Sequence, residues 1–103
     1  MYLAIRKFSG VKDPEGILKR IETELVPQIR ELPGFIAYYA VKFDDGSYGP
    51  ASIFETKSNL DNALEHGRNW LKNNFADNFP NEPETISGEV LFGSVGKTIA
   101  KTA

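Results

Sequence analysis

The stretch from Phe35 to Phe43 has the composition of a β-strand, but its apolar and polar side chains do not alternate. Neighbouring side chains of a strand point to opposite faces. One face of this stretch carries Phe35, Ala37, Tyr39, Val41 and Phe43, and the other carries Ile36, Tyr38 and Ala40. The pattern therefore predicts a strand that is covered on both sides.

Two amphipathic helices are predicted from the spacing of apolar residues. The first begins at Asp13, a capping residue type followed by a proline, and keeps one apolar stripe as far as Leu32. Pro27 is expected to interrupt this helix, because proline removes an amide and crowds the preceding turn. The second helix is predicted to begin with Ser58 or Asn59 as its cap and to run to about Phe79.

The remaining apolar segments predict strands at residues 2–8, 33–43, 51–56 and 85–92. Asp45-Gly46 tolerates the positive φ angles of a tight reversal, so a hairpin is expected between the second and third strands. The order strand, helix, strand, strand, helix, strand predicts an α+β fold of the ferredoxin-like βαββαβ type. We expect residues 1–93 to form this domain and residues 94–103 to form a C-terminal tail.

In this fold both helices cover one face of a four-stranded antiparallel sheet, and the other face has no cover from the same chain. Because the strand at 33–43 is apolar on both sides, a monomer would expose a large apolar patch. A second copy of the sheet, related by a two-fold axis, would cover it. The sequence therefore predicts a homodimer formed through the sheet face.

Composition and charge narrow the classes of partner. The chain has 103 residues, which fits one domain, and its formal net charge is -2, which gives no electrostatic basis for binding nucleic acid or an anionic membrane. It contains no cysteine, so disulfides, thiolate metal sites and a cysteine nucleophile are excluded. No stretch resembles a signal peptide or a membrane span. A cytoplasmic location is the expectation.

Several segments together carry a resemblance to a known family. "MYLAIRKF", "PGFIAYYAV", the "DDGSYG" hairpin, "NWLKNNF" and "GEVLF" follow one another as in the antibiotic biosynthesis monooxygenase-like family. That family belongs to the dimeric α+β barrel superfamily, so the resemblance implies a ferredoxin-like protomer and a sheet-on-sheet dimer. The chain departs from many such relatives at Ala63-Leu64, where they carry a Ser-Asn pair.

The resemblance implies a chemistry as well as a fold. Some members oxidise aromatic polyketides or quinols with dioxygen and without a cofactor, in a pocket between helices and sheet. It would place Trp70 and either Tyr38 or Tyr39 around an aromatic substrate, Asn74 as a hydrogen-bonding group and His66 as the group that transfers a proton. Each residue also has a structural interpretation: Trp70 as a core aromatic, the tyrosines as core or interface residues, and His66 as a solvated helix residue.

Two other sites are not supported. Haem-degrading relatives use an asparagine on the first strand and an iron-ligating histidine after the helix tryptophan, whereas here the first strand has no asparagine and His66 precedes Trp70. One histidine with scattered carboxylates does not make a metal site.

Two hypotheses for the function therefore stay open: a cofactor-independent monooxygenase-like enzyme acting on a small aromatic or quinone-like compound, and a non-enzymatic homodimeric ligand-binding or accessory module.

Overall fold

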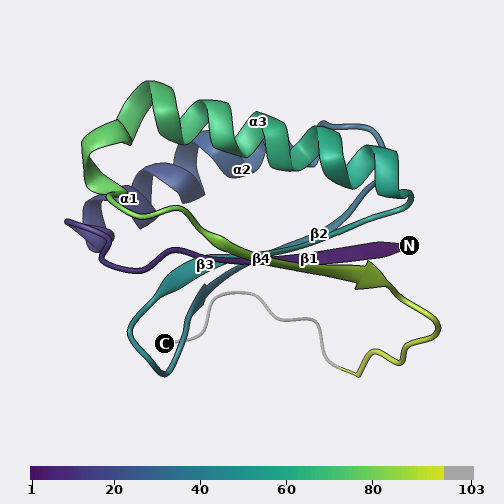
Figure 1. The fold of residues 1–103 in the computed structure, drawn as a ribbon. Coiled ribbons are helices and arrows are strands. Elements are labelled where there is room, and N and C mark those ends of the chain that lie inside the picture. The colour runs from purple at the N-terminus through teal and green to yellow at the C-terminus, as the bar shows by residue number, and fades with distance from the viewer. Residues whose placement is uncertain (97–103) are drawn as a thin grey trace.

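The fold is a single antiparallel sheet with all of its helices on one face (Figure 1). The computed structural model describes residues 1–96, and the strand order in the sheet is β2-β3-β1-β4. The elements along the chain are β1 (Tyr2–Lys7), α1 (Pro14–Arg20), the π-helical turn η1 (Ile21–Leu25), α2 (Val26–Arg30), β2 (Phe35–Lys42), β3 (Tyr48–Phe54), α3 (Lys57–Phe75), the short 3-10 helix η2 (Ala76–Asn78) and β4 (Glu84–Glu89). The predicted α+β, ferredoxin-like arrangement is confirmed.

The strand register separates the two faces of the sheet. Tyr38 and Ala4 both lie opposite Ser52, on the face that the helices cover. Tyr39 and Ile5 both lie opposite Ala51, on the other face. We call this second side the open face; its apolar members are Leu3, Ile5, Ala37, Tyr39, Val41, Ala51, Ile53 and Ile86.

A register shift between Phe35 and Ala37 changes which residues of β2 share a face. Phe35 pairs with Phe54 on the helix-covered side, whereas Ala37 and Tyr39 lie on the open face. A bulge adds one residue to a strand and so reverses the alternation beyond it. The prediction that Phe35 shares a face with Ala37 and Tyr39 was therefore wrong. Both sides of β2 are nevertheless apolar, as predicted.

The core lies between the sheet and the helices. Phe54, Ile17 and Leu60 are its largest fully buried side chains. Trp70 belongs to the same buried cluster, with Leu25 and Ile29 from the first helical region. The helices therefore bury their apolar stripes on one side of the sheet only.

Two predicted features of the first helix can be compared with the structure: the cap at Asp13 and the interruption near Pro27. Asp13 has a left-handed backbone (φ 51°) and its side chain makes no capping hydrogen bond, so the predicted cap was wrong. A capping side chain normally stands on an extended residue, from which it reaches the free amides. The predicted interruption near Pro27 takes the form of the π-helical turn η1, in which the amide of Val26 donates to the carbonyl oxygen of Ile21.

Thr56, rather than Ser58 or Asn59, caps α3. Its backbone is extended and its hydroxyl oxygen accepts a hydrogen bond from the amide of Asn59 at 3.0 Å. The cap lies two residues before Ser58 and three before Asn59, because β3 ends at Phe54 and the chain turns at once into the helix.

Removing this cap is expected to destabilise the protein. Thr56→Ala should lower the free energy of unfolding by about 1 kcal/mol, the usual loss for a capping threonine. Ser58→Ala, in the first turn of the same helix, should change it by less than about 0.5 kcal/mol. Urea denaturation of the two variants and the natural protein measures both values, and a larger loss from Ser58→Ala would contradict the assignment of the cap.

The hairpin between β2 and β3 is confirmed. Gly46 has φ 88°, which glycine adopts without strain, and the amide of Phe43 donates to the carbonyl oxygen of Ser47 at 2.8 Å. The Asp45 carboxylate accepts hydrogen bonds from the hydroxyl and amide of Ser47 and from Lys7, and these bonds lower the pKa of Asp45. Asp45 is thus part of the turn, as the sequence indicates.

Two strands have different bounds from those predicted. β3 begins at Tyr48, so Pro50 lies inside it, at a gap in the ladder between the pairs Ile5–Ala51 and Phe8–Tyr48 where no amide donor is required. β4 ends at Glu89, opposite Tyr2, and one further backbone bond follows it, from the amide of Val90 to the carbonyl oxygen of Met1 at 2.8 Å.

The end of the described chain is apolar and exposed. Figure 1 shows that the segment after β4 leaves the sheet on the side away from the helices. Leu91, Phe92 and Val95 in this segment are largely exposed. The predicted tail at 94–103 falls mostly outside the described residues, so the domain boundary after residue 93 stays a prediction. Within residues 1–96, no helix combines the length and apolar character that crossing a membrane requires.

Candidate functional site

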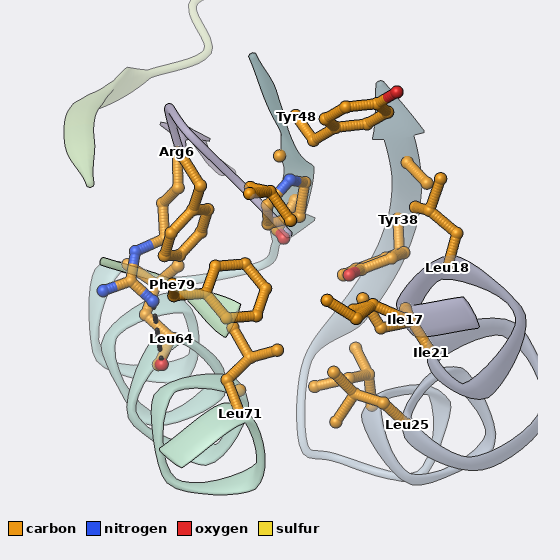
Figure 2. A pocket seen from close by; sticks show the side chains of 18 of the residues that line it. Arg6, Ile17, Leu18, Ile21, Leu25, Tyr38, Tyr48, Leu64, Leu71 and Phe79 are labelled. Carbon is orange, nitrogen blue, oxygen red and sulfur yellow. Dashed lines mark hydrogen bonds between the residues drawn. The ribbon is translucent and has the colours of Figure 1, made fainter. Parts of the chain in front are cut away.

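An apolar pocket lies between the helices and the sheet, and we call it the main pocket (Figure 2). Figure 2 shows Ile17, Ile21 and Leu25 on one side of it and Leu64, Leu71 and Phe79 on the other. Its volume is about 60 Å³. A cavity of about 150 Å³ accommodates benzene, so side chains around this pocket have to move before an aromatic ring can enter.

Tyr38 supplies a polar group to this pocket. It stands on β2 opposite Ser52, and Figure 2 shows its hydroxyl pointing into the pocket between the two sets of helix side chains. Burial raises the pKa of Tyr38 to about 12, so the phenol stays protonated near neutral pH. Because its hydroxyl has no hydrogen-bond partner within residues 1–96, Tyr38 is available as a donor to a bound molecule.

Arg6 is the charged side chain of the main-pocket lining, and it was not predicted from the sequence. It is 6% exposed, and its Nη1 donates to the carbonyl oxygen of Leu64 at 3.3 Å. Its Nε has no hydrogen-bond partner among residues 1–96. Burial lowers the pKa of Arg6, and the positive charge of Arg68 lowers it further. The alternation of side chains along β1 could have indicated this position. Tyr2, Ala4, Arg6 and Phe8 share one face of the strand, so the charge of Arg6 lies among core residues.

Local packing fixes the position of Arg6. A side chain at Gly49 would collide with the carbonyl oxygen of Arg6, so only glycine allows β1 and β3 to approach so closely there. The Arg6 guanidinium carbon lies 5.9 Å from the centre of the Phe8 ring. Arg6 is therefore held in the wall of the pocket by the sheet itself.

A second, wider hollow adjoins the main pocket, and we call it the side cleft. Its volume is about 390 Å³. It shares Arg6, Phe8, Leu71 and Phe79 with the main pocket. The lining that belongs to the side cleft alone is Arg68, Lys72, Phe75, Ala76, Pro80, Asn81, Glu82 and Pro83. The rings of Phe8 and Phe79 pack edge to face with centres 5.0 Å apart in the shared wall.

The structure places the sequence-predicted residues in different surroundings. Of the two tyrosines, Tyr38 lines the main pocket, whereas Tyr39 lies on the open face and is 44% exposed. Trp70 packs in the core, with its ring centre 5.6 Å from that of Phe75, and it lines neither hollow. Tyr38 packs against the buried cluster that contains Trp70, but of these two only Tyr38 lines the main pocket.

His66 and Asn74 make structural contacts outside both hollows. The Nε2 of His66 lies 2.7 Å from the Oε1 of Gln28 on α2. Asn74 donates to the carbonyl oxygen of Trp70 at 2.8 Å and accepts a bond from the Nη2 of Arg20 at 3.1 Å. His66 and Asn74 therefore connect α3 to the first helical region. The side of α3 that borders the main pocket is formed by other residues, namely Ala63, Leu64, Gly67 and Leu71.

The described residues offer no cluster for a metal. Among residues 1–96, no group of three or more histidine, cysteine, aspartate or glutamate side chains is arranged to hold an ion.

Comparison with known proteins identifies the fold through solved structures. No protein-family model and no curated protein matches the chain. An antibiotic biosynthesis monooxygenase structure from Nitrosomonas europaea is 18% identical, with a TM-score of 0.70 over 89% of this chain and 100% of that one. A monooxygenase encoded by ActVA-Orf6 of Streptomyces coelicolor, in complex with nanaomycin D, is 14% identical, with a TM-score of 0.69 over 93% and 92%. A mutant of MhuD with two manganese protoporphyrin IX molecules per active site is 14% identical, with a TM-score of 0.69 over 93% and 100%.

These matches define a class of fold. The chain has the ferredoxin-like α+β fold of antibiotic biosynthesis monooxygenase structures, over most of its length. Identities of 14% and 18% carry the resemblance in fold and not the activity or ligand of those proteins.

Proposed function

We propose that this protein binds a small aromatic or quinone-like compound in the main pocket and oxidises it with dioxygen as a cofactor-independent monooxygenase-like enzyme. The observation that carries the proposal is the apolar pocket between helices and sheet, into which the protonated hydroxyl of Tyr38 points. Two proteins of the same fold are described with bound ligands, one with nanaomycin D and the other with manganese protoporphyrin IX.

The reaction can be written for an anthrone as a test substrate. Its ring CH2 group becomes a carbonyl group by taking one atom of dioxygen, and the other atom leaves as water with the two hydrogens. The substrate supplies every electron, so the reaction needs no external reductant. In this scheme Tyr38 donates a hydrogen bond to the substrate oxygen, and the apolar lining keeps bulk water from the reacting carbon.

The second candidate function is a non-enzymatic ligand-binding or accessory module. It is favoured by one observation: the residues that line the main pocket include no histidine, aspartate or glutamate. A pocket without a side-chain base suits binding better than proton abstraction. The two functions share the ligand class and differ in whether dioxygen is consumed.

Dioxygen uptake in the presence of anthrones and hydroquinones distinguishes them. We expect uptake by the natural protein and about a tenfold reduction in Tyr38→Phe, which loses one hydrogen bond to the substrate. Tyr39→Phe, the adjacent residue on the opposite face, should keep the natural rate. Binding of these compounds without any uptake would favour the non-enzymatic module.

The same assay tests the residues predicted from the sequence. His66→Ala and Trp70→Phe probe the proposed proton transfer and stacking. Because both residues lie outside the two hollows, we expect each variant to keep at least about half of the natural uptake. A loss in His66→Ala as large as that in Tyr38→Phe would support a site beside α2 in place of the main pocket.

We also propose that two copies associate through the open face, with one pocket in each protomer. The support is the apolar character of that face and the exposure of Tyr39 and Ile86 on it, at 44% and 56%. The main pocket lies on the helix-covered side, so this association leaves it accessible.

A further inference from the structure

Arg6 is a buried cation that forms no ion pair with any of residues 1–96, although the more distant carboxylates of Glu65 and Glu82 act on it and raise its pKa. It is 6% exposed, its single hydrogen bond is 3.3 Å long, and its Nε has no partner. The ion pairs formed among residues 1–96 do not include it. A buried charge normally has a partner of opposite sign that offsets its loss of solvation. Among residues 1–96, the Arg6 guanidinium thus has no carboxylate in direct contact.

Two more cations border the same space. Arg68 and Lys72, one helical turn apart on α3, line the side cleft together with Arg6. Glu82 is the only acidic residue in the described lining, and the nearest carboxylate to Arg68 among the described ion pairs is that of Glu65, at 3.9 Å. The described lining thus holds three cations and one carboxylate. Arg6 feels the repulsion of Arg68 more strongly than the attraction of either Glu65 or Glu82.

The cationic cleft and the apolar pocket are continuous at Arg6. Arg6, Leu71 and Phe79 belong to the walls of both hollows. Figure 2 shows Arg6 and Phe79 together on the side of the main pocket opposite Ile17 and Leu25. A molecule that extends through this shared wall would meet a guanidinium group at one end and hydrocarbon at the other.

We propose that the ligand is an amphipathic anion, whose carboxylate or phenolate oxygen binds Arg6 in the side cleft and whose aromatic body lies in the main pocket. The inference rests on the proposed function, because it assigns a charge to the ligand of the same pocket. A planar guanidinium group presents paired donors that match planar oxygen anions, and such hydrogen bonds are stronger than neutral ones.

A phenolic ligand gives this charge a role in the chemistry. The positive field of Arg6, Arg68 and Lys72 stabilises the ionised phenol, so its proton passes to water without a side-chain base. The phenolate is the electron-rich form that reacts with dioxygen. The absence of a base from the main-pocket lining would then be compatible with catalysis.

Binding of 2-naphthoate and of its neutral analogue 2-naphthamide tests the charge requirement. By isothermal titration, the natural protein should bind the anion about tenfold to a hundredfold more tightly than the amide, the factor given by one charge-assisted hydrogen bond. Arg6→Met should remove this preference and leave the affinity for the amide unchanged. Arg30→Met, at an exposed arginine on α2, should keep the preference.

The thermal stability of the free variants separates an anion site from a structural arginine. Arg6→Met replaces an unpartnered buried charge with hydrocarbon, so its melting temperature should equal or exceed that of the natural protein. A lower melting temperature with intact naphthoate binding would overturn the proposal. The variant carrying Arg68→Met and Lys72→Met, both at exposed positions, provides an independent test: it should weaken naphthoate binding several-fold and leave naphthamide binding unchanged.

The remaining outcomes identify which proposal fails. Equal binding of naphthoate and naphthamide by the natural protein would overturn the charge requirement and leave the proposed function standing. Binding of neither compound would overturn both proposals. The absorbance of bound 2-naphthol tests the phenolate form: an ionised spectrum at neutral pH supports it, and a neutral spectrum together with weak naphthoate binding contradicts an anion site.

Discussion

Replacing Phe54 with alanine is expected to lower the free energy of unfolding by about 3–5 kcal/mol, the range measured for large aromatic truncations in protein cores. Phe54 is 0% exposed, and its ring packs edge to face on Phe35 with centres 5.8 Å apart. It also lies opposite Tyr2, so it joins β1, β2 and β3 beneath the helices. The variant would leave a cavity that strands on both sides cannot close.

Urea denaturation at one fixed protein concentration measures this loss, since any association adds to apparent stability. Phe54→Leu is the matched control: it keeps most of the volume and should lose clearly less than Phe54→Ala. A loss below about 1 kcal/mol for Phe54→Ala would mean that the sheet and helices are not packed through this residue.

The order of helices and strands could be predicted from local signals in the sequence, and the structure has the same order. The signals are the apolar stripe of the first helix, the reversal at Asp45-Gly46 and the break near Pro27, and each acts within a few residues. Such signals depend on backbone conformation and helical or strand periodicity, which a sequence displays directly. They were sufficient to predict the βαββαβ order and the layer of helices on one face.

The main pocket depended on information that the sequence does not display. Which tyrosine faces inwards is decided by the register of β2, and the shift between Phe35 and Ala37 is visible only once β2 is paired with β3. The environment of Arg6 is set by Leu64, 58 residues away, and by glycine at position 49. Long-range contacts of this kind cannot be deduced from spacing along one segment.

The candidates chosen by residue type illustrate the same limit. His66 and Trp70 were selected because their side chains suit proton transfer and stacking, yet each has a structural contact that satisfies it, with Gln28 and Phe75 respectively. Arg6 was not selected, since a charge on a short strand normally points to solvent. What distinguishes Arg6 is a missing partner, and this property exists only in the folded chain.

The open face of the sheet leads to the last prediction, which concerns association. Its members run across all four strands, from Tyr39 on β2 to Ile86 on β4. Tyr39 and Ile86 remain 44% and 56% exposed in the single chain. Contiguous apolar patches of this kind are uncommon on soluble monomers and mark contact surfaces. In a two-fold homodimer the open face of one chain would contact the open face of a second copy, and no other protein would be needed to cover it.

The natural protein should therefore sediment at micromolar concentration as a particle of twice the 11.5 kDa chain mass. Ile86→Glu should convert it to a monomer, because two-fold symmetry places two like charges in one apolar interface. The cost to the fold of each chain is small, since Ile86 is already half exposed. Asn73→Glu, the same added charge on the exposed side of α3, should remain dimeric. A natural protein that sediments as an 11.5 kDa monomer at this concentration would contradict association through the open face, and the pockets would then belong to independent chains.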